Sequence, residues 1–491
     1  MGKASESYIN DDLELNEKSD LKINVAAELT EDEKNLIKVC LRKMDIRILP
    51  IVILIYICAL MDRSNIGSAL VNGLRDGLKL NNTEEGNVTS MFYVFYILCE
   101  TPSNVLLKKF KPHVWFAFIG CGWSIACIGL AFVKTGTLFV ILRCILGALE
   151  AGLTPGIVGY FAYWYTRSEI GYRMTLFFTA VPISGIIGSP LAGAFASLDM
   201  SKSLKFMKFQ NIFFLEGILT LAICAASFFL IRDYPDQANF FTAEEKELVV
   251  RRLKREQGMA SETHATFKQT LHTMLDWKMW TFAVIFYGLN NAYVVLGIFA
   301  PTLIRSFGYS GIQSTYLAII PNAAGLFGTM FVLSQVDKKS YVMLIILNSC
   351  ISIIGYSVAS FGKGSILRLI FVGVAGFGAM ANIPLSLSWM SVNQGGIYKG
   401  MIASALVVSF GSICGVVSPR LYVEKFKPKY LAGNLLTIGT IVLSVILSIL
   451  LAIYFNSKNK QRDSNPVDVS HLSELEQRNL NDAHPNFRYK L

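Results

Sequence analysis

The 491-residue chain is 53% hydrophobic and only 16% charged, whereas about 25% of residues are charged in an ordinary globular protein. This balance, with a mean hydropathy of +0.46, argues against a soluble protein and favours a polytopic membrane protein. The net charge of +10 does not point to nucleic acid, because the basic residues fall in short clusters between hydrophobic segments. We interpret them as residues that set the orientation in the membrane and face anionic lipid headgroups.

Residues 1–44 are predicted to form a charged, mobile cytoplasmic tail. The tail ends in an amphipathic helix, where Thr30 and Glu33 have the spacing of a capping box. No apolar stretch of a cleavable signal peptide precedes it. Hydrophobic segments of about 20 residues, the length that spans a bilayer, then recur along the chain. We predict twelve spanning helices, at residues 46–70, 88–107, 114–133, 137–160, 174–197, 211–231, 279–301, 314–334, 341–361, 366–389, 400–421 and 431–455.

A polar interruption at residues 232–278 divides these segments into two groups of six. The predicted organisation is therefore an all-α membrane protein with two six-helix halves, at residues 45–231 and 279–456. The interruption reads as a cytoplasmic middle loop that contains one surface helix. Residues 457–491 are polar and are predicted to form a disordered cytoplasmic tail.

The short loops indicate the orientation. Lys and Arg are more frequent in the loops that share a side with the two termini, which places both termini in the cytoplasm. Two glycosylation sequons, at Asn81 and Asn87, fall in the first loop on the opposite side and agree with this orientation. We expect a monomer in the plasma membrane.

The sequence lacks the motifs that are typical of other classes of membrane protein. The sequence has no phosphate-binding loop for an ATP-driven pump, and no HExxH or GxSxG motif for a membrane enzyme. The nine cysteines show no CxxC or other metal-ligand spacing, so we interpret them as small buried hydrophobes. We expect no enzyme activity, no metal and no cofactor other than a proton as coupling ion.

Among the charged residues inside the predicted spans of the first half, four form two groups. Asp62 and Arg63 are adjacent in the first span, and Arg143 and Glu150 are seven residues apart in the fourth. Seven residues are about two helical turns, so Arg143 and Glu150 share one face, roughly 10 Å apart. A lone charge at membrane depth costs at least about 2.5–3.5 kcal/mol. We therefore predict that the four residues meet in a water-filled cavity between the halves.

The six-plus-six arrangement resembles the major facilitator superfamily, in which substrate binds between the halves. The resemblance narrows to the anion:cation symporter family, specifically its fungal allantoate permease branch. It covers nearly the whole membrane region, through the motifs MDRSNIGSAL (61–70), ETPSNVLLKKFKP (100–112), RCILGALEAGLTPG (143–156), YFAYWYTRSEIGYR (160–173), FFLEG (213–217) and DYPDQANFFTAEEK (233–246). The sequence departs from the family in the loop before the sixth span, where Phe209-Gln210-Asn211 stands.

The resemblance implies a secondary transporter, commonly a proton-coupled symporter of small organic anions. It implies that Asp62, Arg63, Arg143 and Glu150 carry coupling and binding. We assign the coupled proton to Asp62 and Glu150 and the substrate carboxylate to Arg63 and Arg143, with direct contact to the substrate as the alternative role of Glu150. Burial raises the pKa of a carboxyl and a nearby arginine lowers it, so a carboxyl that gains and loses its arginine partner can bind and release a proton. The planar guanidinium of arginine can also bind both oxygens of a substrate carboxylate. We expect Asp62 to pair with Arg143 or Arg63 when deprotonated. The alternative is a static buried ion pair that joins the first and fourth helices.

Polar residues elsewhere complete the predicted site. In the seventh span, Asn290, Asn291 and Tyr293 are candidates to line the substrate cavity, although a mid-membrane amide can also bridge helices. Glu100, Glu169 and Arg173 lie near cytoplasmic ends of helices and are candidates for a gate.

The sequence therefore predicts proton-coupled symport of a small organic anion by alternating access. Within the resembled branch, a vitamin-like or ureide carboxylate such as nicotinate or allantoate is the expected substrate. A membrane nutrient sensor of the same fold that does not transport is the alternative. A channel is disfavoured because one charged cluster in a two-half layout suits alternating access.

Overall fold

The computed structural model describes residues 30–107, 110–200, 205–261, 274–336, 338–394, 397–465 and 481–491. In this part of the chain, eleven helices are long and apolar enough to cross a membrane. Helix α4 (Asn82–Leu107) lies between two of them and is less apolar because it carries Glu84, Glu85 and Glu100. With α4 as the twelfth, the predicted all-α fold of two six-helix halves is confirmed.

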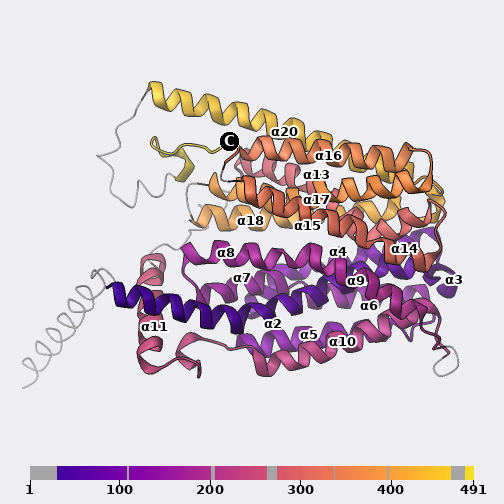
Figure 1. Cartoon of the computed structure of the whole chain (residues 1–491), viewed down its shortest axis with the longest axis horizontal. Coiled ribbons are helices and arrows are strands. Elements are labelled where there is room, and N and C mark those ends of the chain that lie inside the picture. Colours follow the sequence, from indigo (N-terminus) through magenta and orange to yellow (C-terminus); the bar gives the residue numbers. More distant parts are fainter. Residues whose placement is uncertain are drawn as a thin grey trace, which may run out of the picture.

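The first half contains α2 (Glu31–Val71), α4, α5 (Pro112–Leu130), α6 (Gly136–Glu150) continued by α7 (Leu153–Trp164), α8 (Arg167–Phe178) continued by α9 (Ala180–Ser197), and α10 (Lys208–Leu230). The second half contains α13 (Trp277–Arg305), α14 (Gly311–Leu317) continued by α15 (Ile319–Gln335), α16 (Tyr341–Phe361), α17 (Ser365–Val392), α18 (Ile397–Ser412) continued by α19 (Cys414–Val417), and α20 (Leu431–Ser464). Figure 1 shows the halves side by side, with the first in indigo to magenta and the second in orange to yellow.

The two ends of the bundle differ. The start of α2, helix α11 (Ala243–Ser261) and the C-terminus lie at one end, which we call the terminal end (Figure 1). The short helix α3 (Leu74–Leu78) and α14 lie at the opposite end, which we call the far end (Figure 1). The beginning and the end of the described chain therefore share one side of the bundle.

Three breaks within the spanning segments have one cause. Helix α6 gives way to α7 at Ala151–Gly152, α8 to α9 at Thr179, and α14 to α15 at Ala318. Each break lies three or four residues before a proline, namely Pro155, Pro182 and Pro321. A proline has no N–H to donate to the preceding turn, and its ring crowds the carbonyl four residues earlier.

Helix α2 joins the predicted tail to the first span. It runs from Glu31 without interruption, and its capping box is confirmed, since the Thr30 hydroxyl accepts from the Glu33 amide while the Glu33 carboxylate accepts from the Thr30 amide.

At the other end of the chain, the prediction of disorder is wrong for residues 457–464, which continue α20, and for residues 481–491, which pack against the second half. Residues 1–29 and 466–480 lie outside the described part.

Candidate substrate and proton site

The centre of the site is an ion pair between α2 and the end of α6. Arg63 donates through Nε to Glu150 Oε1. The Glu150 side chain is 0% exposed and that of Arg63 is 16% exposed, so the arginine keeps an open side. The guanidinium of Arg63 also lies over the ring of Tyr96, 4.6 Å from its centroid. The Arg63 guanidinium is therefore partly buried between the carboxylate of Glu150 and the ring of Tyr96, which we call the aromatic wall.

Arg143 is bound differently although it lies on the same face of α6 as Glu150. Its Nε donates to the carbonyl of Val88 (3.0 Å) and its Nη1 reaches the carbonyl of Asp62 at 3.5 Å. The guanidinium lies 4.9 Å from the centroid of Phe92 and is buried. Backbone carbonyls stabilise the cation but do not neutralise it. Arg143 therefore contributes positive potential to the cluster without a carboxylate partner.

The carboxylate of Asp62 points toward α5 rather than toward an arginine. Its Oδ1 accepts from the thiol of Cys127 at 3.6 Å, and its Oδ2 has no hydrogen-bond partner. The expectation that Asp62 pairs with Arg143 or Arg63 is wrong for this conformation, because Glu150 takes Arg63 and Arg143 reaches only the main chain of Asp62. The four charged residues lie together on α2 and α6 within the first half, in a different pairing, and none of them lines either of the two cavities described below.

Aromatic side chains surround the open side of Arg63. The ring centroid of Tyr96 on α4 lies 4.6 Å from the guanidinium carbon, and that of Phe92 on the same helix lies at 5.8 Å. Tyr293, the third residue predicted on α13 to line the cavity, is half-buried and packs against the core cluster that contains Tyr56, Tyr93 and Tyr96. The tyrosines of the first half were missed, because nothing in their spacing separates a cavity wall from ordinary core.

The two asparagines of α13 have other roles. Asn290 is half-buried and donates to the carbonyl of Gly411 at 3.1 Å. Asn291 is fully buried, accepts from Ser418 at 2.5 Å, and lies 3.4 and 3.3 Å from the hydroxyls of Thr437 and Thr440. The prediction that Asn291 lines the substrate cavity is wrong in this conformation, because its amide joins helices within the second half. The bridging alternative for mid-membrane amides applies to it.

The residues predicted to form a gate lie at the terminal end. Glu100 on α4 accepts from Ser409 on α18 at 3.2 Å, which joins the two halves. Arg173 binds both carboxylate oxygens of Asp45, at 2.7 and 2.8 Å, and Glu169 binds Arg252 of α11. The pairing of Glu169 and Arg173 is thus limited to a bond from Arg173 to the Glu169 carbonyl. These bonds hold α8, α2 and α11 together.

The halves are closed against each other at the far end. Asn72 donates to Thr315 at 2.9 Å, and Arg305 donates to the carbonyl of Val71 at 2.7 Å. Gly67 makes the approach of α2 to α13 possible, since a Cβ there would lie 1.7 Å from the carbonyl oxygen of Ile298. At the terminal end, the Glu100–Ser409 bond is the inter-half hydrogen bond that the described residues provide. The conformation is therefore closed at the far end.

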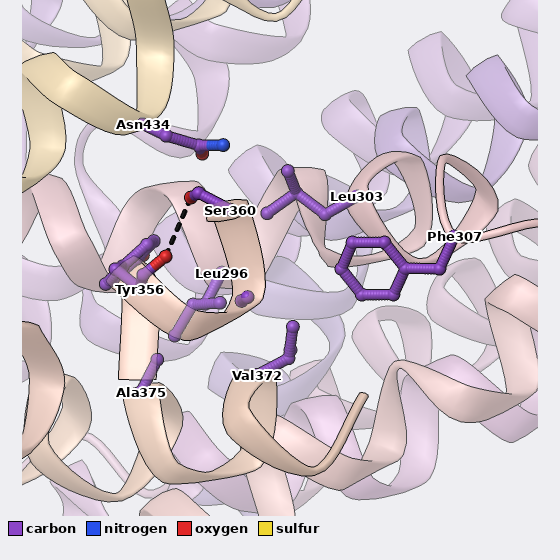
Figure 2. A pocket seen from close by; sticks show the side chains of 9 residues that line it. Leu296, Leu303, Phe307, Tyr356, Ser360, Val372, Ala375 and Asn434 are labelled. Atoms are coloured by element: carbon purple, nitrogen blue, oxygen red, sulfur yellow. Dashed lines mark hydrogen bonds between the residues drawn. The ribbon is translucent and has the colours of Figure 1, made fainter. Parts of the chain in front are cut away.

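Among the described residues lie two small cavities of about 10 Å³ each, which is room for about one water molecule. One lies between the halves and is polar, with Ser64, Asn65 and Asn322 among its lining residues. The other lies within the second half, where Figure 2 shows Leu303, Phe307 and Val372 around it and Ser360 hydrogen-bonded to the carbonyl of Tyr356. Neither cavity contains a charged residue. The buried Asp62, Arg143, Glu150 and Glu216 all lie in the first half.

Comparison with known proteins identifies the family. Residues 52–419 match the family model of the major facilitator superfamily. The chain belongs to the major facilitator superfamily. It is therefore a multi-pass secondary transporter, in a family of transporters rather than enzymes.

Curated relatives cover most of the transporter. The high-affinity nicotinic acid transporter of Saccharomyces cerevisiae is 26% identical over 91% of this chain and 84% of its own. A putative tartrate transporter of Agrobacterium vitis is 28% identical over 84% of this chain and 91% of its own. An uncharacterised transporter of Schizosaccharomyces pombe is 28% identical over 92% and 90% of the two chains.

Solved structures share the fold. The xylose transporter of E. coli, in a partially occluded inward-open conformation, superposes with a TM-score of 0.64 at 15% identity, over 84% of this chain and 98% of its own. A bacterial homologue of the human lysosomal transporter Spinster gives 0.63 at 13% identity, over 82% and 95% of the two chains.

Proposed function

We propose that this transporter is a proton-coupled symporter of a small organic anion that carries a carboxylate. The observation that carries the proposal is the buried Glu150 paired with the partly exposed Arg63, beside the aromatic wall of Tyr96. The names of two relatives, a nicotinic acid transporter and a putative tartrate transporter, support an organic anion as the substrate. So does the resemblance to the anion:cation symporter family, and we propose nicotinate or allantoate as the first candidates.

Proton and substrate act on the same arginine in this mechanism. While Glu150 is ionised it occupies Arg63, and a substrate carboxylate has to compete for the guanidinium. Protonation of Glu150 removes its charge and frees the fork of Arg63 for a bidentate bond to the substrate. Protonation of Glu150 and binding of the anion are then coupled, because each favours the other. Arg143 adds positive potential, and Asp62 carries a proton near it.

Alternating access fits the way in which the halves meet. With the terminal end in the cytoplasm, closure at the far end corresponds to a conformation closed to the outside. Opening of the far end and closure at Glu100 and Ser409 would expose the same site to the other side. We propose that Glu100, Glu169 and Arg173 belong to the cytoplasmic gate, and that the protein acts as a monomer in the plasma membrane.

Uptake by purified protein in lipid vesicles tests the proposal. A panel of labelled carboxylates, including nicotinate, allantoate and tartrate, is offered with and without an inward proton gradient. We expect one of them to accumulate by about tenfold for each pH unit of gradient if one proton accompanies one monovalent anion. Counterflow of the same label separates a transporter from a sensor that only binds, because a sensor gives none. Accumulation that ignores the proton gradient would contradict the coupling.

A further inference from the structure

A second carboxyl faces Asp62 in the interior of the first half. Glu216, on α10, is 1% exposed, and neither of its carboxyl oxygens has a hydrogen-bond partner. Asp62 is also 1% exposed, with its Oδ2 unpartnered. Three of the four oxygens on these two side chains are therefore buried without a partner. Buried polar groups almost always have partners, so the exception requires an explanation.

The thiol of Cys127 contacts both Asp62 on α2 and the main chain of α10 near Glu216. Its Sγ lies 3.6 Å from Asp62 Oδ1 and 3.7 Å from the carbonyl of Phe213. Glu216 follows Phe213 by three residues and so lies on the same face of α10. Helix α10 packs against both α2 and α5. The shared contact with Cys127 therefore places both carboxyls where α2, α5 and α10 meet.

Neither arginine of the site is bonded to the carboxyl group of Asp62 or Glu216. Arg63 is bonded to Glu150, and Arg143 reaches only the main-chain carbonyl of Asp62. Two anions buried side by side with no cation bonded to either carboxyl are disfavoured, because each loses its hydration and repels the other. A proton is the ligand that removes this charge.

The ionisable groups around the pair are Cys58 on α2, Cys127 on α5, Cys224 on α10, and Arg143 and Glu150 on α6. Glu150 is the other carboxyl among them, and it is bonded to Arg63. Helix α9, which also packs against α10, has no ionisable side chain in residues 180–197. The thiols donate or accept weakly, so the carboxyl pair is the group that exchanges a proton.

We propose that Glu216 and Asp62 form a proton-binding pair, distinct from the Arg63–Glu150 pair that binds substrate. The inference rests on the proposed proton coupling and divides it between two places. Glu150 sets when the anion binds, and the Asp62–Glu216 pair holds the transported proton while the far end is closed. One proton binds to one carboxylate oxygen of the pair, and the same proton leaves when a change of conformation brings water to it.

The competing explanation is that Glu216 is a permanently neutral filler of a polar gap. Two substitutions separate the roles because they change opposite properties. Glu216→Gln keeps the size and the hydrogen-bonding shape of a neutral carboxyl but has no proton to exchange. Glu216→Asp keeps the titrating group and loses one methylene of packing. A filler tolerates Gln better than Asp, whereas a proton carrier tolerates Asp better than Gln.

The first measurement needs no substrate. Infrared difference spectra of the full chain in lipid vesicles, recorded through a pH titration, report the carbonyl stretch of each carboxyl that gains a proton. We expect Glu216→Gln to remove one titrating band, Glu216→Asp to shift it, and Glu244→Gln, which removes an exposed carboxyl of α11, to leave it unchanged. A titration identical in wild type and Glu216→Gln would overturn the proposal.

The second measurement uses labelled nicotinate in the same vesicles. We expect Glu216→Gln to keep counterflow within about twofold and to lose the accumulation, about tenfold per pH unit, that a proton gradient drives in the wild type. Glu216→Asp should keep accumulation with a shifted pH dependence. Gradient-driven accumulation that survives in Glu216→Gln would overturn the inference. If the wild type itself carries no nicotinate, the proposed substrate fails, and the infrared result still decides the role of Glu216.

Discussion

At the scale of single residues, what matters is which carboxyl holds which arginine. The sequence places Asp62, Arg63, Arg143 and Glu150 at membrane depth, and the high energy of a lone charge there requires them to converge. Adjacency and spacing do not determine the pairing, because two neighbours on α2 point to different sides. Arg63 turns toward Glu150, while Asp62 turns toward α5. The partners could be predicted as a set but not as pairs.

Glu216 was harder to assign for a related reason. Its place in the sixth span was visible in the sequence, but its neighbour was not, since the face of α10 toward α2 depends on how three helices pack. A motif therefore indicates that a charge is present, and only coordinates show what it faces. The same holds for Asn291, whose amide could equally have lined a cavity or joined helices.

Glu150→Gln tests the competition for Arg63. The amide imitates a protonated carboxyl, so Arg63 is released at every pH. We expect the affinity for the transported anion to rise by about tenfold relative to wild type at high pH and to become nearly independent of pH. The wild type should approach the variant as the pH falls, because protonation of Glu150 then frees the same arginine. Equilibrium binding of the labelled anion measures both.

Glu244→Gln is the control for this measurement, since its carboxyl is exposed on α11. It should keep the wild-type affinity and its pH dependence. If Glu150→Gln shows the same pH dependence of binding as the wild type, competition for Arg63 is not the coupling step.

At the scale of elements, hydrophobic length located the spans, whereas local chemistry determined their interruptions. The breaks before Pro155, Pro182 and Pro321 follow from the missing N–H of proline. Pro50, Pro190, Pro301 and Pro384 lie inside continuous helices, so proline alone does not predict a break. The α18–α19 break at Ile413 has no proline nearby, and nothing in the structure explains it.

The C-terminal segment, residues 481–491, shows where composition misleads. Its polar sequence predicts disorder, but its polar groups have partners on the second half. Tyr489 stacks on Phe455 with ring centroids 4.2 Å apart, and Asn393 exchanges hydrogen bonds with the main chain of Lys490. Asp482 bonds to Lys278 and, at 2.6 Å, to the buried Lys399. This polar segment is ordered because Lys278 and Lys399, on the helices of the second half, carry the charge opposite to that of Asp482.

Asp482→Asn should loosen this docking. The change leaves Lys399 with Asp276 alone and removes a buried ion pair, which typically destabilises by about 3–5 kcal/mol. We expect the amides of Tyr489 and Lys490 to exchange hydrogen at least about 30-fold faster, corresponding to about 2 kcal/mol of lost protection. Asp463→Asn is the matched control, because its pair with Arg488 is exposed and should contribute about 0–1 kcal/mol. Equal exchange in the two variants would contradict a structural role for Asp482.

The pH dependence of the docking has a definite sign. Burial alone would raise the pKa of Asp482, but hydrogen bonds from Lys278 and Lys399 outweigh it and hold the pKa below its ordinary value of 3.8. A lowered pKa stabilises the docked state above the ordinary value, and this stabilisation is lost only as the pH falls through the lowered one. The loss of protection of Tyr489 and Lys490 caused by Asp482→Asn, measured against the wild type at the same pH, should therefore stay constant from about pH 8 to about pH 5.

At the scale of the whole molecule, the pattern of hydrophobic segments was enough to predict two halves, but not the conformation they adopt. Closure at the far end depends on side chains that meet across the halves, such as Asn72 with Thr315 and Ser90 with the carbonyl of Val416. Such contacts form between segments that are more than 200 residues apart. Composition and spacing carry no information about them.

A reversible cross-link at the far end tests whether this closure has to open during transport. Asn72 and Thr315 are in hydrogen-bond contact, so Asn72→Cys with Thr315→Cys places two thiols within reach of a disulfide. We expect oxidation to reduce uptake of the transported anion by at least about tenfold and a reductant to restore it, because a locked far end prevents alternating access. Asn72→Cys alone controls for the native cysteines and should keep its uptake under the same oxidant. Uptake that continues after the two halves are shown to be joined would mean that the substrate does not pass between α2 and α14.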